Sequence, residues 1–274
     1  IPNSYQNNAE YLVNDLYLKG KYRYEIGVFS LIGKLDFHQL HGVLKNHENT
    51  IRQSPFFLCS NIGLDWEINK KNKLISSYSY NTVNAKILDV YSDFVLTGSR
   101  SFSKGAGGFN QLNASSFIIN YQFGNWTDRF FAKTFIFYVK HHDFYSTNTL
   151  VTQNFVQYQK ILNRNRDFLS INTQVDFFLK FISSNLKVDL AYATIKFKNI
   201  VNNSDLRLVT SSNYNCGLEL RSGFKGVFNY HIGTKWSTNQ VETIIRNSFS
   251  NNVSFLDLTF LFNNRLDLQI QTER

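Results

Sequence analysis

The chain has 274 residues, of which 43% are hydrophobic and 18% are charged, and its mean hydropathy is −0.27. Its net charge is +9, but the basic residues are scattered among carboxylates and form neither a Lys/Arg block nor a basic helix, which argues against a nucleic-acid-binding surface. No run of 18 or more apolar residues occurs, and this excludes a transmembrane helix.

Hydrophobic and polar residues alternate with a period of two along most of the chain. Leu256, Leu258 and Phe260, for example, are separated by Asp257 and Thr259. Such a segment is a strand with one apolar and one polar face, and about 10 residues are enough to span a bilayer as a tilted strand. The chain has 26 Phe and 15 Tyr but only two Pro, a composition typical of a membrane-embedded sheet.

We therefore predict an all-β fold, a transmembrane antiparallel β-barrel of the outer-membrane type, with about 12 strands as one domain over residues 1–274. A soluble all-β adhesin or lectin stays open as an alternative, and it would bury the outward aromatic residues between two sheets. In chain order, six hairpins with tight turns are predicted at 11–37, 58–80, 116–139, 168–192, 214–236 and 256–270.

Polar segments separate the hairpins. A polar stretch is predicted at 41–54 and the longest irregular region at 81–111, while 150–162 is expected to extend strands beyond the membrane. Outer-membrane barrels have short periplasmic turns and longer extracellular loops. We therefore expect the extracellular side to carry 81–111, 199–213 and 239–252, and the periplasmic side to carry the turns 69–72, 124–128 and 263–265.

The alternation also assigns faces to individual strands. Leu186, Val188, Leu190 and Tyr192 are expected to face lipid, with Lys187 and Asp189 facing the lumen. In the third hairpin Phe117, Ile119, Tyr121 and Phe123 are expected outward, and the chain returns through an apolar series made of Phe131, Phe135, Phe137 and Val139.

Possible catalytic and metal sites have simpler explanations. His141 and His142 are adjacent on a predicted strand and point to opposite faces, so they cannot share one metal ion without a bend. Gly105–Gly108 lacks the strand and helix that flank a phosphate-binding loop, and paired inward carboxylates are ordinary lumen residues. We expect no enzymatic activity, no catalytic residue, no metal and no cofactor. Cys59 and Cys216 are expected to be unpaired.

The three tryptophans can serve as ligand-stacking residues or as anchors at the membrane surface. Amphipathic rings settle at the level of the lipid headgroups, so we expect Trp66, Trp126 and Trp236 to belong to interfacial girdles. Trp126, in a short turn, fits the periplasmic girdle.

Several segments resemble Bacteroidetes TonB-dependent outer-membrane receptors. Asp89–Gly98, with Arg100–Phe102 and Phe109–Leu112, is similar to a long extracellular loop of that family. Four further segments resemble the C-terminal part of the barrel in that family: Asn199–Arg207, Gly217–Phe224, Ser254–Leu258 and Gln271–Arg274.

The resemblance implies a 22-stranded barrel with an N-terminal plug that imports a nutrient such as a siderophore, glycan or peptide. The present chain would be a C-terminal half fragment of a secreted precursor, without the plug and the final strands. The implied location is the bacterial outer membrane. The implied partners are lipid, lipopolysaccharide, TonB through the missing N-terminal part, and a surface lipoprotein or other envelope subunits, but not nucleic acid. The alternative is a structural or assembly subunit without transport activity.

A ligand-binding site is expected in the longest loop, since importers of this kind capture ligands on extracellular loops. This loop combines basic, aromatic and amide groups with flexible glycines. The candidate residues are Arg100, Phe102, Lys104, Phe109, Asn110 and Gln111. The alternative is a loop that only packs on its neighbours or on lipopolysaccharide.

Overall fold

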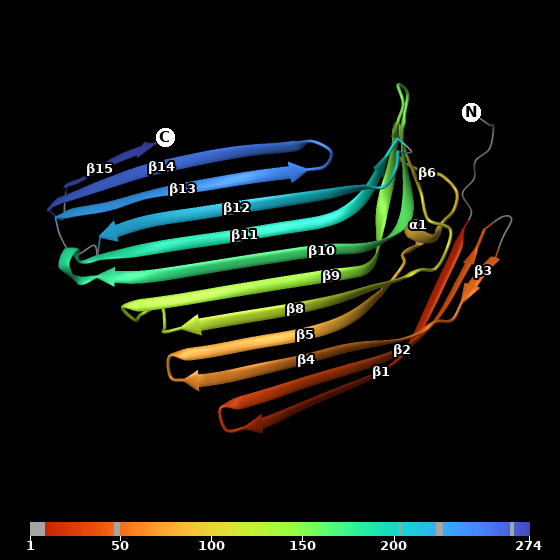
Figure 1. Ribbon diagram of the computed structural model, residues 1–274, viewed down its shortest axis with the longest axis horizontal. Helices are drawn as coiled ribbons and strands as arrows, with labels where there is room; N and C mark the ends of the chain where they lie inside the picture. The colour runs from red at the N-terminus through yellow and green to blue at the C-terminus, as the bar shows by residue number, and fades with distance from the viewer. Residues whose placement is uncertain (1–8, 47–49, 203, 223–226, 264–265) are drawn as a thin grey trace.

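The computed structural model describes residues 9–46, 50–202, 204–222, 227–263 and 266–274. Within them, one antiparallel sheet contains twelve long strands that pair in chain order (Figure 1). These strands are β1 Glu10–Ile26, β2 Phe29–Lys45, β4 Phe56–Asn69, β5 Asn72–Asn84, β8 Gln111–Phe123, β9 Phe130–Val151, β10 Val156–Leu179, β11 Ser184–Val201, β12 Arg207–Ser222, β13 Phe228–Glu242, β14 Arg246–Asn263 and β15 Leu266–Glu273. The predicted fold class and the number of about twelve strands are confirmed.

Short elements occupy the two polar segments, which are less irregular than predicted. They are β3 Thr50–Gln53, β6 Val95–Gly98, β7 Ser101–Lys104 and the one-turn helix α1 Ile87–Val90, and a 3-10 turn lies at Lys180–Ile182. β2 continues into the first polar segment as far as Lys45 and pairs there with β3. Within the described ranges, no helix has the length and apolar character needed to cross a membrane.

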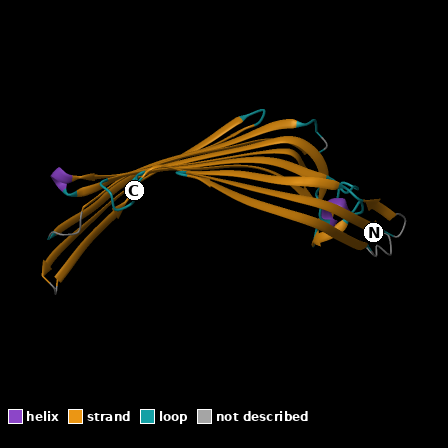
Figure 2. Ribbon diagram, turned by 90° about the horizontal axis from the view of Figure 1, so that it is seen from below, coloured by secondary structure: helices purple, strands orange, loops and turns teal. Residues whose placement is uncertain are grey.

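The sheet is open and curved, and it is not covered by a second sheet in the part of the chain that is described (Figure 2). The tight turns lie together at one end of the sheet and the longer connections lie together at the other end, where α1 sits inside the curvature (Figures 1 and 2). The turns 69–72 and 124–128 lie at the first end, as the alternation predicts. The turn predicted at 263–265 falls largely outside the described residues.

The outward face is apolar, and its side chains are exposed. Leu190, Ile232 and Trp236 have 47%, 46% and 44% of their surface exposed. Cross-strand pairs such as Leu190 with Cys216 keep these residues on one face, and Lys187 and Asp189 lie on the other face. An apolar surface of this extent is not stable in contact with water, and it matches the lipid-facing band of a membrane barrel. The soluble sandwich alternative is therefore wrong.

Aromatic rings border this band at both ends. Towards the turns, Phe29 stacks on Trp66 with ring centroids 5.1 Å apart, and Phe130 contacts Phe123 at 5.4 Å and Phe177 at 6.2 Å. At the opposite border, Tyr192 and Tyr214 lie 4.8 Å apart on neighbouring strands, and Tyr138 and Trp236 occupy the same face, on β9 and β13. Two such girdles are typical of outer-membrane barrels.

The apolar series predicted for the return strand of the third hairpin proves to face inward. Phe135 pairs with Asn120 on β8 and with Asn172 on β10, so it lies on the inner face. The outward positions of β9 include Phe130, Ala132, Thr134, Ile136 and Tyr138. Because β9 is apolar on both faces, alternation alone does not fix its orientation.

Beyond the outer girdle, two segments predicted as loops are mostly strand. β11 and β12 are separated only by 202–206, and β13 and β14 only by 243–245. The predicted strand extension at 150–162 is confirmed in β9 and β10. Both faces of a strand meet water above the membrane, so the hydrophobic alternation fades although the backbone ladder continues.

The hairpin of β9 and β10 exchanges its neighbours near its tip. In the membrane-facing part β9 pairs with β8 and β10 pairs with β11, whereas at the tip β9 meets the end of β11 and β10 meets β7. Asn165, with a φ of 62°, lies where the exchange begins. A two-stranded ribbon twists more strongly than a wide sheet. We infer that this twist turns the hairpin tip over, so that β9 reaches β11 and β10 reaches β7.

Candidate functional site

Polar side chains line the inner face of the sheet. One row runs across six neighbouring strands, from β9 to β14, and consists of Phe135, Asn172, Ala191, Asn215, Ser237 and Asn251. Each amide in this row offers both donors and acceptors to a ligand. Further amides join it, since Asn215 Nδ2 donates to Asn213 Oδ1 and Asn213 Nδ2 donates to Asn239 Oδ1.

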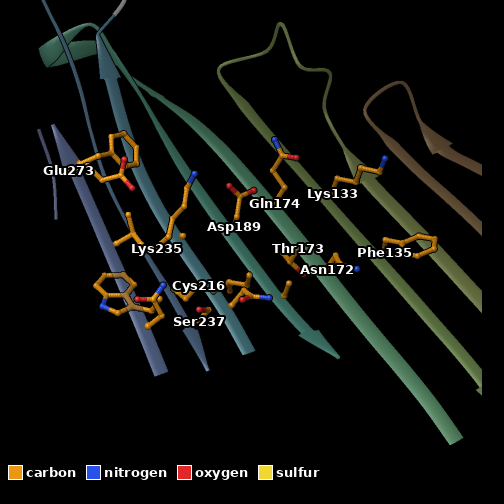
Figure 3. A pocket seen from close by; sticks show the side chains of 18 residues that line it. Lys133, Phe135, Asn172, Thr173, Gln174, Asp189, Cys216, Lys235, Ser237 and Glu273 are labelled. Atoms are coloured by element: carbon orange, nitrogen blue, oxygen red, sulfur yellow. The ribbon is translucent and has the colours of Figure 1, made fainter. Parts of the chain in front are cut away.

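This row crosses a hollow of about 820 Å³ in the inner wall (Figure 3). Its lining includes Lys133, Asp189, Lys235 and Glu273, which surround the amides with charges of both signs. Small side chains create the space. A Cβ on Gly217 would lie 3.6 Å from its nearest neighbour, the Asp189 Cβ, which is an ordinary contact distance. Close packing therefore does not require glycine at this position, but the absence of a side chain adds to the space of the hollow.

A network of ion pairs borders the hollow on the side of the turn end. Lys187 Nζ is 2.9 Å from Asp189 Oδ2, and Lys235 Nζ is 3.2 Å from Glu219 Oε1. His231 lies between two carboxylates, 3.4 Å from Glu219 and 3.6 Å from Asp257. These pairs are partly exposed, so they add little stability and mainly define a charged wall.

The segment 85–110, the inner loop, folds back over the inner face at the loop end. Val90 has 0% of its surface exposed, and Leu44, Ala85 and Tyr91 complete a small apolar cluster. The Tyr11 hydroxyl on β1 donates to the Ala85 carbonyl at 3.0 Å. Burial, aided by nearby Asp93, raises the pKa of Tyr91.

Backbone contacts hold the inner loop in a closed form. Gly105 N donates to Tyr91 O and Ala106 N donates to Asp89 O, both at 2.7 Å. A Cβ on Gly105 would lie only 2.6 Å from Tyr91 O and 2.7 Å from Asp89 O. This crossing therefore requires glycine, a requirement that the Gly-rich motif alone did not reveal.

The six candidate ligand residues divide into two groups. Arg100, Phe102 and Lys104 belong to the β6–β7 hairpin: the Arg100 carbonyl accepts a hydrogen bond from Val156 N, Phe102 packs edge-on to Phe155 at 6.0 Å, and Lys104 Nζ lies 5.4 Å from the Phe94 ring centroid. Arg100 is exposed, and the other two are half-buried.

The other three candidates are part of the packing of the inner loop. Phe109 stacks on Tyr11 with centroids 5.8 Å apart, and Asn110 Nδ2 donates to the Tyr145 hydroxyl at 3.1 Å. Gln111 begins β8, and its Nε2 is buried without a hydrogen-bond partner among the described residues. The six residues thus do not converge on one point, and the amide-lined hollow is a site that the sequence motifs did not identify.

The adjacent histidines point to opposite faces, as predicted. Arg166 Nε donates to His141 Nδ1 at 3.5 Å on the inner face, whereas His142 Nε2 lies 2.8 Å from Ser115 Oγ on the outer face. Within the described residues, no group of three or more His, Cys, Asp or Glu side chains could hold a metal ion. Cys59 and Cys216 are free, as expected.

No protein-family model matches the sequence, and no curated protein matches it. The chain is similar in structure to the FrpB iron transporter of Neisseria meningitidis, with a TM-score of 0.57 and 14% identity, over 98% of this chain and 41% of that one. Lower TM-scores of 0.48 and 0.47 are found with the FpvAI–pyocin S2 complex and the copper transporter OprC, at 10% and 9% identity, covering 94% of this chain and about 40% of each.

The chain spans about two fifths of the length of these three chains. At these identities the likeness concerns the fold. The girdled apolar band and the similarity to FrpB agree on one architecture. The chain has the fold of an outer-membrane β-barrel, which is consistent with a location in the bacterial outer membrane.

Proposed function

We propose that the chain is the barrel part of a TonB-dependent receptor that imports a nutrient across the outer membrane. The observation that carries this proposal is the combination of a lipid-facing band with an inner wall that is hollowed and lined by amides and charges. The similarity to the FrpB barrel over 98% of the chain supports it. The likeness to the Bacteroidetes branch rests on sequence motifs alone and stays a prediction.

The chemistry of the wall favours a ligand rich in hydrogen-bonding groups. Amides such as Asn172 and Asn215 donate and accept at once, and Phe135 beside them offers an aromatic face. A glycan, a peptide or a siderophore would satisfy these groups. Arg100, Phe102 and Lys104 would meet the ligand first, because they lie at the loop end, whereas Phe109, Asn110 and Gln111 would hold the inner loop in place.

The partners follow from the same proposal. TonB would act through a segment that precedes the barrel, together with a plug, and a surface lipoprotein or other envelope subunit could present the ligand. The alternative function is a structural or assembly subunit without transport activity. The upstream sequence of the gene distinguishes the two, because an importer requires a plug and a TonB box.

Uptake measurements test the import proposal directly. Cells with the full-length gene, cells lacking it and cells lacking TonB would be supplied with labelled ferric siderophore, oligosaccharide and peptide. We expect one ligand class to be lost equally in both mutants. Normal uptake of all three classes in the cells lacking the gene would reject import in favour of the assembly function.

Paired variants then test the loop end. Arg100→Ala with Lys104→Ala should lower uptake, whereas Lys70→Ala with Lys71→Ala, which removes the same charge from a turn at the other end of the sheet, should not. Equal uptake by the two double variants would remove the β6–β7 hairpin from the ligand path.

A further inference from the structure

A row of three lysines with a single aspartate among them lies on the outward face beyond the aromatic girdle. Lys140 on β9 and Lys196 on β11 flank Asp167 on β10 in direct cross-strand register. Lys198 follows two residues later on the same face of β11 and pairs with Leu208. Because side chains alternate along a strand, Lys140 shares its face with Tyr138, and the two β11 lysines share theirs with Tyr192.

The ammonium groups of these lysines form no direct ion pair within the described residues. No carboxylate oxygen of that part of the chain lies within 4.0 Å of any of the three. Asp167, which stands between two of them, instead accepts a hydrogen bond from the Tyr138 hydroxyl at 2.9 Å. Lys196 and Lys198 are exposed and Lys140 is half-buried.

The position of the lysines tells which kind of ligand can reach them. Tyr138, Tyr192 and Tyr214 mark the level of the lipid headgroups. Towards the loop end, Lys140 stands two residues beyond Tyr138, and Lys196 and Lys198 stand four and six residues beyond Tyr192. Lys140 and Lys196 are two strands apart, about 10 Å, and Lys196 and Lys198 about 7 Å, a spread that suits a headgroup with more than one phosphate.

We propose that Lys140, Lys196 and Lys198 form a binding site for the phosphate groups of a lipid in the outer leaflet of the membrane. Each lysine supplies a positive charge, and together they tie the headgroup to the strands β9 and β11. The site rests on the proposed orientation, with the loop end outside the cell, but not on nutrient import. Failure of the uptake test would therefore leave it untouched.

Lipid titration of the full-length protein tests the site. The protein, delipidated in detergent, would be titrated with phosphorylated lipid A, with the same lipid A after phosphate removal, and with inorganic phosphate. The test variant replaces all three lysines with Gln. The control variant carries Lys70→Gln, Lys71→Gln and Lys180→Gln, which remove the same charge at the turn end of the sheet. Heat-modifiable migration on a gel would confirm that both variants fold.

For lipid A, we expect the dissociation constant to rise about fivefold for each lysine lost, and hence about a hundredfold in the test variant, with little change in the control. Dephosphorylated lipid A should bind the unmodified protein as weakly as the test variant binds the phosphorylated form. If the test variant does not fold, Lys196→Gln alone should weaken binding about fivefold.

Three results would overturn the proposal. The first is an equal affinity of the test and control variants, or of Lys196→Gln and the unmodified protein. The second is undiminished binding of dephosphorylated lipid A. The third is displacement of lipid A by inorganic phosphate at equal concentration, which would indicate a site for small anions.

Discussion

Asp89 Oδ1 of the inner loop lies 3.8 Å from Lys160 Nζ on β10. The same carboxylate accepts a hydrogen bond from Lys86 N at 3.1 Å, and the Asp89 carbonyl accepts one from Ala106 N. Asp89 thus joins both halves of the inner loop to a strand 71 positions away in the sequence. With Tyr11 bonded to Ala85 on the other side, the loop bridges β1 and β10 across the inner face.

The close backbone crossing at Gly105 gives the first prediction. Gly105→Ala should release the inner loop, because its Cβ would clash with two carbonyl oxygens that cannot move independently, at a cost of about 1–3 kcal/mol. Gly108→Ala is the matched control, since its nearest neighbour lies 3.8 Å away. Limited proteolysis between residues 92 and 108 should be faster in the first variant only, with the barrel still heat-modifiable.

Lipid exposure of the outward face gives the second prediction. Leu190→Arg should lower the free energy of unfolding in lipid vesicles by about 2–4 kcal/mol, because a charge would face the hydrocarbon core. Ala191→Arg, one residue along and facing the hollow, should cost much less. Urea titration of both full-length variants measures the difference, and a reversed order would reject the assignment of faces.

Sidedness can be tested by single-cysteine labelling on intact cells. In a background with Cys59→Ser and Cys216→Ser, a cysteine at Ser204 or Ile244 should react with a membrane-impermeant maleimide. A cysteine at Lys70 or Trp126 should react only after the membrane is permeabilised. Ile244 and Trp126 are 89% and 84% exposed, so accessibility within the fold does not limit either site. Equal labelling of the two sets would contradict the topology.

The twist in the β9–β10 hairpin gives the fourth prediction. Asn165 has a left-handed backbone conformation, which glycine adopts freely and a β-branched residue resists. Asn165→Val should therefore destabilise the hairpin tip by about 1–2 kcal/mol, while Asn165→Gly should be nearly neutral. Hydrogen exchange of the amides in 144–162 measures this locally, and similar protection in both variants would show that the twist does not depend on this conformation.

Hydrophobic alternation predicts the membrane-facing half of this fold well. Leu186, Val188, Leu190 and Tyr192 lie on one face, as expected, because lipid on one side and water on the other impose a period of two. The signal fails where the environment is the same on both faces. It missed the strands beyond the girdle, between 199 and 213, and it did not orient β9, whose inward Phe135 is apolar like its outward neighbours.

The candidate site was harder to predict, since it depends on contacts between distant segments. The pairing of Phe109 with Tyr11 and of Asp89 with Lys160 has no local signal in the sequence. In the sequence, the inner amides are only single inward-facing positions on separate strands. Its arrangement across six strands became apparent once the cross-strand register was known.

The exchange of neighbours in the β9–β10 hairpin has a consequence for sequence variation. Surface loops of barrels usually tolerate insertions, because their ends are anchored and their tips are free. Here one edge of the tip is paired with β7 and the other with the end of β11, and Asn202 N donates to Thr149 O at 3.0 Å. Added residues in 144–151 or 156–162 would shift both pairings together. In related sequences, insertions and deletions should therefore be rare in the β9–β10 hairpin. They should be more frequent at the β13–β14 turn, whose two strands pair there only with each other.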